Sequence, residues 1–355
     1  MSDKMNPIQA KPGRRSGVEL LRILAAMAVI VLHFNYLPGA SGAADCASGF
    51  NRTFLNALES LCICAVDVFL LISGYFGSRG KAVKIRKMAM LLLQTSFIRL
   101  AASLGFCVLS RRIDFGKLVL ALLPVNYYVI LYVSLMLLSP FINSGLEKLS
   151  DVAIRKLVLI SFSLFALFST FVDVAESLTD ASLSGLNPVS IDGSINGYTI
   201  VNFVLLYLLG AWLRREEDAL AKMVSTPLLW VGLLITAALI YLWQMLQRET
   251  AVMYSNPLVI LEACMVFMLF ARMQLDSKHV NLIAPASFSC FLLQGYILPF
   301  LDYERIAAAS FPMLFGILAL TVIGIYTLSI IAYVAWNWLS KKLLKKTEGW
   351  TISAE

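Results

Sequence analysis

The feature that most constrains this chain is a series of apolar segments, each long enough to cross a lipid bilayer. About 20 consecutive apolar residues span a hydrocarbon core of roughly 30 Å, and such segments recur throughout the 355 residues. Of all residues, 59% are hydrophobic and 14% are charged, and the mean hydropathy is +0.79. These values lie outside the range of soluble globular domains. The sequence therefore predicts one all-α, polytopic integral membrane domain.

Hydropathy and segment length predict about ten transmembrane helices. They are expected at 17–37, 54–75, 88–110, 126–143, 153–174, 199–213, 226–246, 256–273, 281–301 and 310–338. The sequence thus divides into an N-terminal tail over 1–16, a transmembrane domain over 17–340 and a C-terminal tail over 341–355. The first apolar segment is too long for a signal peptide and lacks a small-residue cleavage site, so we expect it to stay in the mature protein.

The distribution of basic residues predicts the orientation of the helices. The chain has 29 Lys and Arg against 22 Asp and Glu. With the N-terminus inside, 21 basic residues fall on the cytoplasmic side, six fall outside, and Arg22 and Arg99 lie within crossings. Because cytoplasmic loops of membrane proteins are enriched in Lys and Arg, both termini are predicted to be cytoplasmic. The same enrichment accounts for the positive net charge, so we expect no nucleic-acid partner.

Three polar side chains interrupt the first apolar segment, "GVELLRILAAMAVIVLHF" at 17–34. Arg22 and His33 are eleven positions apart, about three helical turns or roughly 16 Å, so they share one face, and Glu19 lies near it. A charge near the bilayer centre costs at least a few kcal/mol. Arg22 either snorkels to the interface with Glu19 as its partner or serves a site. His33 is either interfacial or a proton acceptor.

The second crossing ends in "AVDVFLLISGYFGSRGKAVKIRK". Ser73-Gly74-Tyr75 marks the end of the helix, and five basic residues follow: Arg79, Lys81, Lys84, Arg86 and Lys87. This cluster either sets the topology alone or forms a cytoplasmic mouth that attracts a multiply phosphorylated anion such as coenzyme A. Within the crossing, Asp67 either orients His33 or pairs with a basic residue.

The first two crossings together are similar to a known family. The "ELLRI" and "HF" segments of the first helix, followed by "DVFLLISGYF", resemble the membrane-bound acyltransferase family 3, many of whose members O-acetylate bacterial surface glycans. The resemblance extends through "NYYVILYVSLMLLSPFIN", "GYTIVNFVLLYLLGAWLRR" and "YSNPLVILEACMVFMLF". One departure is Gln294, at a position where the family commonly has His. Because His279 is predicted in a cytoplasmic loop, His33 is the one imidazole expected within the membrane.

The resemblance implies a multi-pass enzyme of the bacterial plasma membrane. It would move an acyl group, most simply acetyl, from cytoplasmic acyl-CoA to a hydroxyl of a cell-surface or lipid-linked glycan, with membrane lipid as a further partner and no metal. His33 and Arg22 would be catalytic, and the donor would be held by Arg22, Ser73, Gly74, Tyr75, Arg86 and Lys87. His33 is either a general base or the carrier of a covalent acyl group, and both routes remain open.

Two other classes of protein fit parts of the same pattern. A transporter or flippase of glycan intermediates would also place Glu, Arg and His within the membrane, although we detect no internal repeat. A membrane scaffold with an inactive site would agree with Gln294. The loop over 175–198 is expected to be a lid, an acceptor-contacting loop or an inert linker. The six cysteines lie mostly in apolar segments and are expected to be structural.

Overall fold

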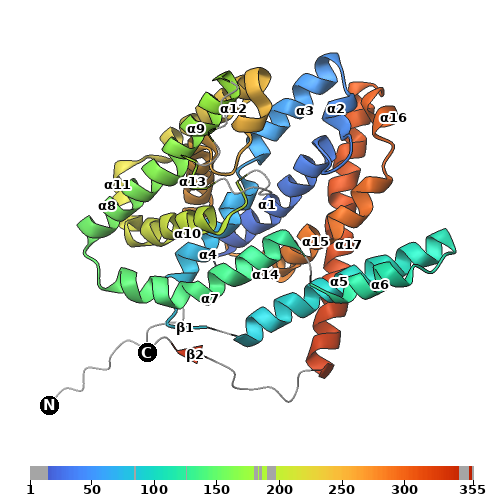
Figure 1. The fold of residues 1–355 in the computed structure, drawn as a ribbon, viewed down its shortest axis with the longest axis horizontal. Helices are drawn as coiled ribbons and strands as arrows, with labels where there is room; N and C mark the ends of the chain where they lie inside the picture. Colours follow the sequence, from blue (N-terminus) through green and yellow to red (C-terminus); the bar gives the residue numbers. More distant parts are fainter. Residues whose placement is uncertain are drawn as a thin grey trace.

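The computed structural model describes residues 15–83, 85–124, 126–179, 183, 186–189, 197–343 and 352–353, and it is a bundle of helices (Figure 1). The first half contains α1 (Ser16–Asn35), α2 (Ala43–Cys46), α3 (Gly49–Cys62), α4 (Ala65–Gly77), α5 (Ile85–Ser110), α6 (Phe115–Leu122), α7 (Tyr127–Glu147), α8 (Asp151–Phe162), the π-helical segment η1 (Ser163–Phe168) and α9 (Ser169–Thr179). The second half contains α10 (Ile200–Arg215), α11 (Glu217–Met223), α12 (Thr226–Ala251), α13 (Pro257–Ala271), α14 (Lys278–Ile283), η3 (Ala284–Ala286), α15 (Ser287–Ile297), η4 (Leu298–Phe300), α16 (Tyr303–Ala307) and α17 (Phe311–Leu343). Two short strands, β1 (Ala82–Val83) and β2 (Ile352–Ser353), pair antiparallel.

The predicted all-α, polytopic architecture is confirmed. Eight helical stretches in the described chain are long and apolar enough to cross a membrane. Each of the ten predicted crossings falls on one helix or on consecutive helical segments, and the two beyond those eight stretches are the shorter helices α10 and α13, with 16 and 15 residues. Most of the predicted loop over 175–198, and nearly all of both predicted tails, lie outside the described residues.

Several crossings are less regular than hydropathy alone predicts. The second crossing consists of α3 and α4, which meet at Ile63 and Cys64. The ninth consists of α14 and α15 joined by the 3-10 turn η3, where Pro285 lacks the N–H group that a continuous α-helix needs. Side-chain caps fix other helix starts: Asn126 accepts from the backbone N–H of Val129 at the start of α7.

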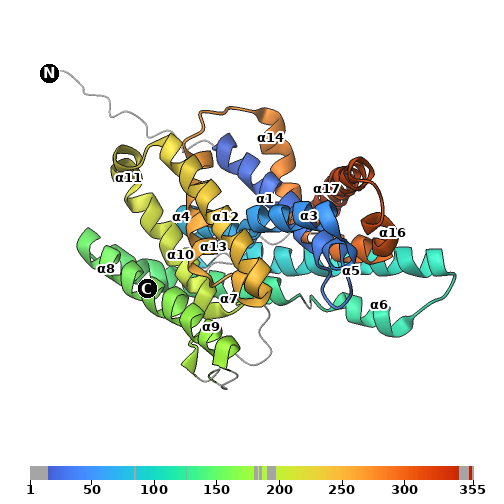
Figure 2. The same cartoon turned by 90° about the horizontal axis from the view of Figure 1, so that it is seen from above.

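Helix α1 lies in the middle of the bundle, with α3, α4, α13, α14, α15 and α17 packed around it (Figure 1). Its apolar side chains enter two hydrophobic clusters, so that Leu21 and Val29 pack toward α4 and α10, whereas Ile30 and Phe34 pack toward α17. By contrast, α5 and α6 lie side by side and project from the bundle (Figures 1 and 2). The first helix is therefore a buried element that neighbouring helices enclose.

The closest helix packing in the bundle is between α4 and α10. A Cβ atom at Gly74 would overlap the carbonyl oxygen of Tyr207, and one at Gly210 would overlap the carbonyl oxygen of Leu71. The two glycines thus let the backbones approach directly, as small residues do at helix interfaces within membranes. This contact fixes the register between the helix that carries Ser73 and the helix that ends in Arg214 and Arg215.

We expect Gly74→Ala and Gly210→Ala to destabilise the protein, because the added methyl groups separate α4 from α10. Overpacking of this kind costs roughly 1–3 kcal/mol, and the thermal unfolding midpoint of the detergent-solubilised protein measures it. Gly324→Ala on α17 is the matched control, since a Cβ atom there meets nothing within 4 Å and Ala favours a helix by up to about 1 kcal/mol. Equal midpoints for Gly74→Ala and Gly324→Ala would contradict the packing argument.

Candidate active site

The two polar residues of the first helix face different cavities. Arg22 lines two adjoining cavities of about 260 and 290 Å³, which share Arg22, Ile72, Ser73, Lys87, Leu91 and Tyr132 and are together called the Arg22 cavity. His33 lines another cavity of about 610 Å³, called the His33 cavity. Because eleven helical residues rise roughly 16 Å, α1 places these two side chains at successive depths in the bundle.

The Arg22 cavity is positively charged and carries hydroxyl groups on one wall. Arg22 Nη1 lies 3.1 Å from Glu19 Oε1, so the predicted ion pair is present. Lys87, at the start of α5, adds a second cation. Ser73 Oγ donates to the carbonyl oxygen of Phe69 and lies 3.2 Å from the hydroxyl of Tyr132. The cavity can therefore hold an anion, and the oxygen atoms of its paired hydroxyls can accept hydrogen bonds from a ligand.

The His33 cavity is larger, and aromatic rings form much of its wall. They come from helices and loops far apart in the sequence: Tyr36, Tyr127, Tyr128, Tyr198, Tyr254 and Phe291. His33 is partly exposed to this cavity and makes no hydrogen bond to any residue in the part of the chain that the structure describes. An imidazole whose nitrogen atoms are not engaged in hydrogen bonds to the protein can accept or deliver a proton.

A charged pair also lines the His33 cavity. Glu59 is 3% exposed, and its Oε1 lies 3.3 Å from Arg248 Nη2, while its Oε2 accepts from Asn35 Nδ2 at 3.1 Å. The guanidinium of Arg248 lies over the ring of Tyr36, 3.3 Å from its centroid. The sequence reasoning missed Glu59 and Arg248, which are 189 positions apart. The signal available was only that each is a charge at the edge of an apolar segment.

An aromatic pair separates the two cavities. Tyr128 on α7 and Phe291 on α15 line both the Arg22 cavity and the His33 cavity, and their ring centroids are 4.9 Å apart. We call these two residues the aromatic junction. Tyr128 also stacks on Tyr132, one helical turn further along α7, with centroids 6.0 Å apart. A movement of these rings would join the cavities into one passage that runs past α1.

The structure brings only some of the other predicted site residues together with Arg22. Ser73 and Lys87 line the Arg22 cavity together with Arg22. Gly74 instead faces α10, and Arg86 is exposed and lines none of the cavities described here. Tyr75 lies in a hydrogen-bonded cluster at the start of α1, which is described below. These side chains diverge because successive helical residues point about 100° apart.

Two further polar residues from the sequence lie in the core. Asp67 is fully buried and its carboxyl oxygens have no hydrogen-bond partner in the described structure, so it does not orient His33. Gln294 is 1% exposed, and its amide nitrogen lies 3.4 Å from the carbonyl oxygen of Phe291. Its contact is thus with the backbone of its own helix, at the residue whose ring forms half of the aromatic junction.

Tyr75 joins Arg15 and Glu217 in a hydrogen-bonded cluster that we call the clasp. Arg15 Nη1 lies 2.6 Å from Glu217 Oε1 and donates to the Tyr75 hydroxyl at 2.8 Å, and that hydroxyl donates to Glu217 Oε2. Burial alone would raise the pKa of Glu217, but the hydrogen bonds from Arg15 and Tyr75 outweigh burial and hold that pKa below its ordinary value. The clasp ties the start of α1 to α4 and α11.

The fold and the site together describe a membrane enzyme with a cationic cavity and a histidine-bearing cavity that meet inside the bundle. A family profile described as an acyltransferase domain matches residues 15–335, nearly the whole chain. The chain therefore belongs to acyltransferase family 3, and it is a membrane acyltransferase. The comparisons with curated proteins and with solved structures found no match to this chain.

We expect Glu217→Gln to lower the thermal unfolding midpoint above pH 4.5, the ordinary pKa of this carboxyl group. A carboxyl group whose pKa is lower in the folded state than in the unfolded state stabilises the fold at pH values above its unfolded-state pKa. This stabilisation is lost as the pH falls through the folded-state pKa. The difference in thermal unfolding midpoint between wild type and Glu217→Gln, roughly 2–4 °C near neutral pH, should thus shrink as the pH falls below 4.5. The midpoint measured across pH 3 to 8, roughly the range over which carboxyl groups titrate, checks this.

The control for the clasp is Asp218→Asn. Asp218 shares the first turn of α11 with Glu217 but is exposed and makes none of the clasp contacts. Both carboxylates interact with the helix dipole, so Asp218→Asn isolates the contribution of the clasp. A pH dependence of Asp218→Asn as large as that of Glu217→Gln would refute the assignment.

Proposed function

We propose that this enzyme transfers an acyl group, most simply acetyl, from acyl-CoA on the cytoplasmic side to a hydroxyl of a cell-surface or lipid-linked glycan. The observation that carries the proposal is the meeting of the Arg22 cavity and the His33 cavity at Tyr128 and Phe291. A donor and an acceptor that enter from opposite sides would meet at this junction. We place the enzyme in a bacterial plasma membrane, in keeping with the resemblance described above.

The Arg22 cavity suits a thioester donor that carries phosphate groups. Arg22 and Lys87 supply positive charge, and the oxygen atoms of the Ser73 and Tyr132 hydroxyls can accept hydrogen bonds from the amide N–H groups of the pantetheine arm. Since Arg22 is roughly 16 Å from His33 along the helix, we assign Arg22 to holding the donor and not to the reacting carbonyl. Tyr128 is itself part of the aromatic junction, and its hydroxyl is our candidate for stabilising the oxyanion.

The His33 cavity suits a sugar acceptor. Aromatic rings stack on the apolar faces of sugars, and carboxylates such as Asp45 and Glu59 accept hydrogen bonds from sugar hydroxyls. The pairing of Glu59 with Arg248 keeps that charge compensated inside the protein. The cavity therefore offers an uncharged polyol both a surface for stacking and acceptors for its hydroxyls.

His33 would act on the acceptor hydroxyl at the junction. Its imidazole takes the hydroxyl proton as the oxygen attacks the thioester carbonyl, and the C–S bond then breaks as the ester forms. The imidazolium returns its proton to the departing thiolate, so His33 ends unchanged. In the covalent alternative, the imidazole nitrogen attacks the thioester carbonyl and the coenzyme A thiolate leaves. The acceptor hydroxyl then attacks the acyl-imidazolium, the ester and free imidazole form, and the hydroxyl proton passes to the thiolate. The transporter and scaffold alternatives gain no support from the match to an acyltransferase domain.

We expect His33→Ala to lower acetyl transfer by about 10²–10⁴-fold, the usual contribution of a positioned general base. The assay supplies acetyl-CoA and a crude lipid-linked glycan extract to the purified protein. His279→Ala is the matched control, because His279 is the other histidine of the chain and is exposed on α14. Arg22→Ala should raise the KM for acetyl-CoA. Full turnover by folded His33→Ala would refute the mechanism.

We expect Phe291→Ala to increase acetyl-CoA hydrolysis in the absence of acceptor by several-fold, because a smaller side chain admits water to the thioester. The measurement is release of free coenzyme A without glycan. Phe288→Ala is the matched control, since Phe288 lines the Arg22 cavity but not the His33 cavity. Equal hydrolysis by the two variants would show that Phe291 does not separate donor from acceptor.

A further inference from the structure

A basic cavity of about 420 Å³ lies beside the end of α4, between α7, α8 and α10. It is distinct from the Arg22 cavity, with which it shares no lining residue. One carboxylate lines it, Glu147, together with four basic side chains: Arg79, Lys81, Arg214 and Arg215. Such an excess of positive charge in a concave space favours an anionic ligand.

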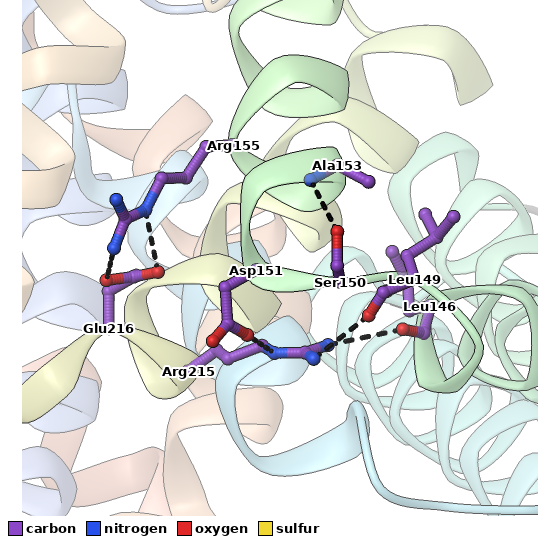
Figure 3. A network of polar contacts seen from close by, with 8 residues as sticks. All are labelled: Leu146, Leu149, Ser150, Asp151, Ala153, Arg155, Arg215 and Glu216. Atoms are coloured by element: carbon purple, nitrogen blue, oxygen red, sulfur yellow. Dashed lines mark hydrogen bonds and ion pairs between the residues drawn. The ribbon is translucent and has the colours of Figure 1, made fainter.

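Part of this basic cavity is a rigid wall. Arg215 Nε lies 2.5 Å from Asp151 Oδ1, and its two Nη atoms donate to the carbonyl oxygens of Leu146 and Leu149 (Figure 3). Close by, Arg155 makes two hydrogen bonds to Glu216, at 2.9 and 2.7 Å (Figure 3). These contacts lock α8 and the α7–α8 connection to the end of α10. The guanidinium of Arg215 is therefore engaged in contacts that hold the helices together.

The other cations of the cavity retain free donors. Arg214 uses one nitrogen, Nη1, to donate to the carbonyl oxygen of Tyr75 at 2.8 Å. Arg79 is exposed and makes no hydrogen bond or ion pair within the described residues. Lys81 lies 3.0 Å from Glu147 in a pair whose side chains are 73% and 61% exposed, and such pairs are weak. Two guanidinium groups thus face the cavity with unused donors.

One short segment forms the wall between this basic cavity and the Arg22 cavity. Ser78 and Arg79 line the basic cavity, whereas Gly77 and Gly80 line the Arg22 cavity. Asn143 Nδ2 holds the segment by donating to the carbonyl oxygens of Gly77 and Gly80, at 2.9 and 2.7 Å. A ligand in the basic cavity would therefore be separated from the Arg22 cavity by a single layer of backbone.

We propose that the basic cavity is a phosphate-binding site, with Arg79 and Arg214 as its principal ligands. Guanidinium groups bind phosphate oxygens through paired, charge-assisted hydrogen bonds, and the cavity holds a phosphate group but not an entire nucleotide cofactor. The phosphate belongs either to the nucleotide end of the donor or to the headgroup of an anionic phospholipid. The first source rests on the proposed function, and the second does not.

The test compares Arg79→Gln, Arg214→Gln and the double variant with wild type in nanodiscs. Arg79→Gln keeps the test informative if Arg214→Gln unfolds, because Arg79 is exposed and makes no hydrogen bond or ion pair in the described chain. Lys222→Gln is the control, since Lys222 is an exposed basic residue on α11 that lines none of the cavities. Binding of coenzyme A and of pantetheine, which lacks phosphate, is measured in discs of phosphatidylcholine, and retention of phosphatidylglycerol is measured by native mass spectrometry.

We expect Arg79→Gln to weaken coenzyme A binding by roughly tenfold and to leave pantetheine binding unchanged, which assigns the site to the donor. Unchanged coenzyme A binding with loss of retained phosphatidylglycerol assigns it to a lipid headgroup. If neither coenzyme A binding nor phosphatidylglycerol retention changes in the variants, or if Lys222→Gln has the same effect, the proposal is overturned. If wild type binds no coenzyme A, the proposed donor is wrong, and the lipid measurement still decides the cavity.

Discussion

The architecture depends on placing the polar side chains of α1 next to hydrogen-bond partners or cavities inside the bundle. Within a bilayer no bulk water is available to solvate such groups. Asn35, for example, is fully buried, and its amide nitrogen donates to the carbonyl oxygen of Leu55 at 2.8 Å and to Glu59. Arg22 has Glu19 on its own helix. Within the described residues His33 has neither an ion-pair partner nor a hydrogen-bond partner, and it faces a cavity. A helix with this pattern must lie at the centre of the bundle.

Much of the fold could be predicted from the sequence, because hydropathy and length depend on the bilayer more than on tertiary contacts. The predicted crossing at 126–143 corresponds to α7, and the one at 226–246 corresponds to α12. The breaks within crossings were not predicted, since Ile63 and Cys64 are apolar and lie within a continuous hydrophobic run. Hydropathy identifies a membrane segment but does not report whether the helix through it is continuous.

The candidate site was predictable only in part. Arg22 and His33 were found because ionisable groups stand out in an apolar helix, and Ser73 because it belongs to a recognisable motif. Which side chains of α4 face the Arg22 cavity, as Ser73 does, depends on the rotation of α4, which is set by the contact of Gly74 with α10. Tyr128 and Phe291 meet only in the folded chain. In an apolar sequence rich in aromatic residues, neither side chain differs from those that merely fill the core.

Asn143 on α7 joins three segments of the bundle through its side-chain amide. It accepts a hydrogen bond from the Tyr207 hydroxyl at 3.0 Å while its amide nitrogen holds the carbonyl oxygens of Gly77 and Gly80. The same helix, α7, carries Tyr128 at its other end. Helix α7 therefore contributes both to the aromatic junction and to the backbone layer between the two cationic cavities, and aspartate in place of Asn143 would lose both donors that hold this layer.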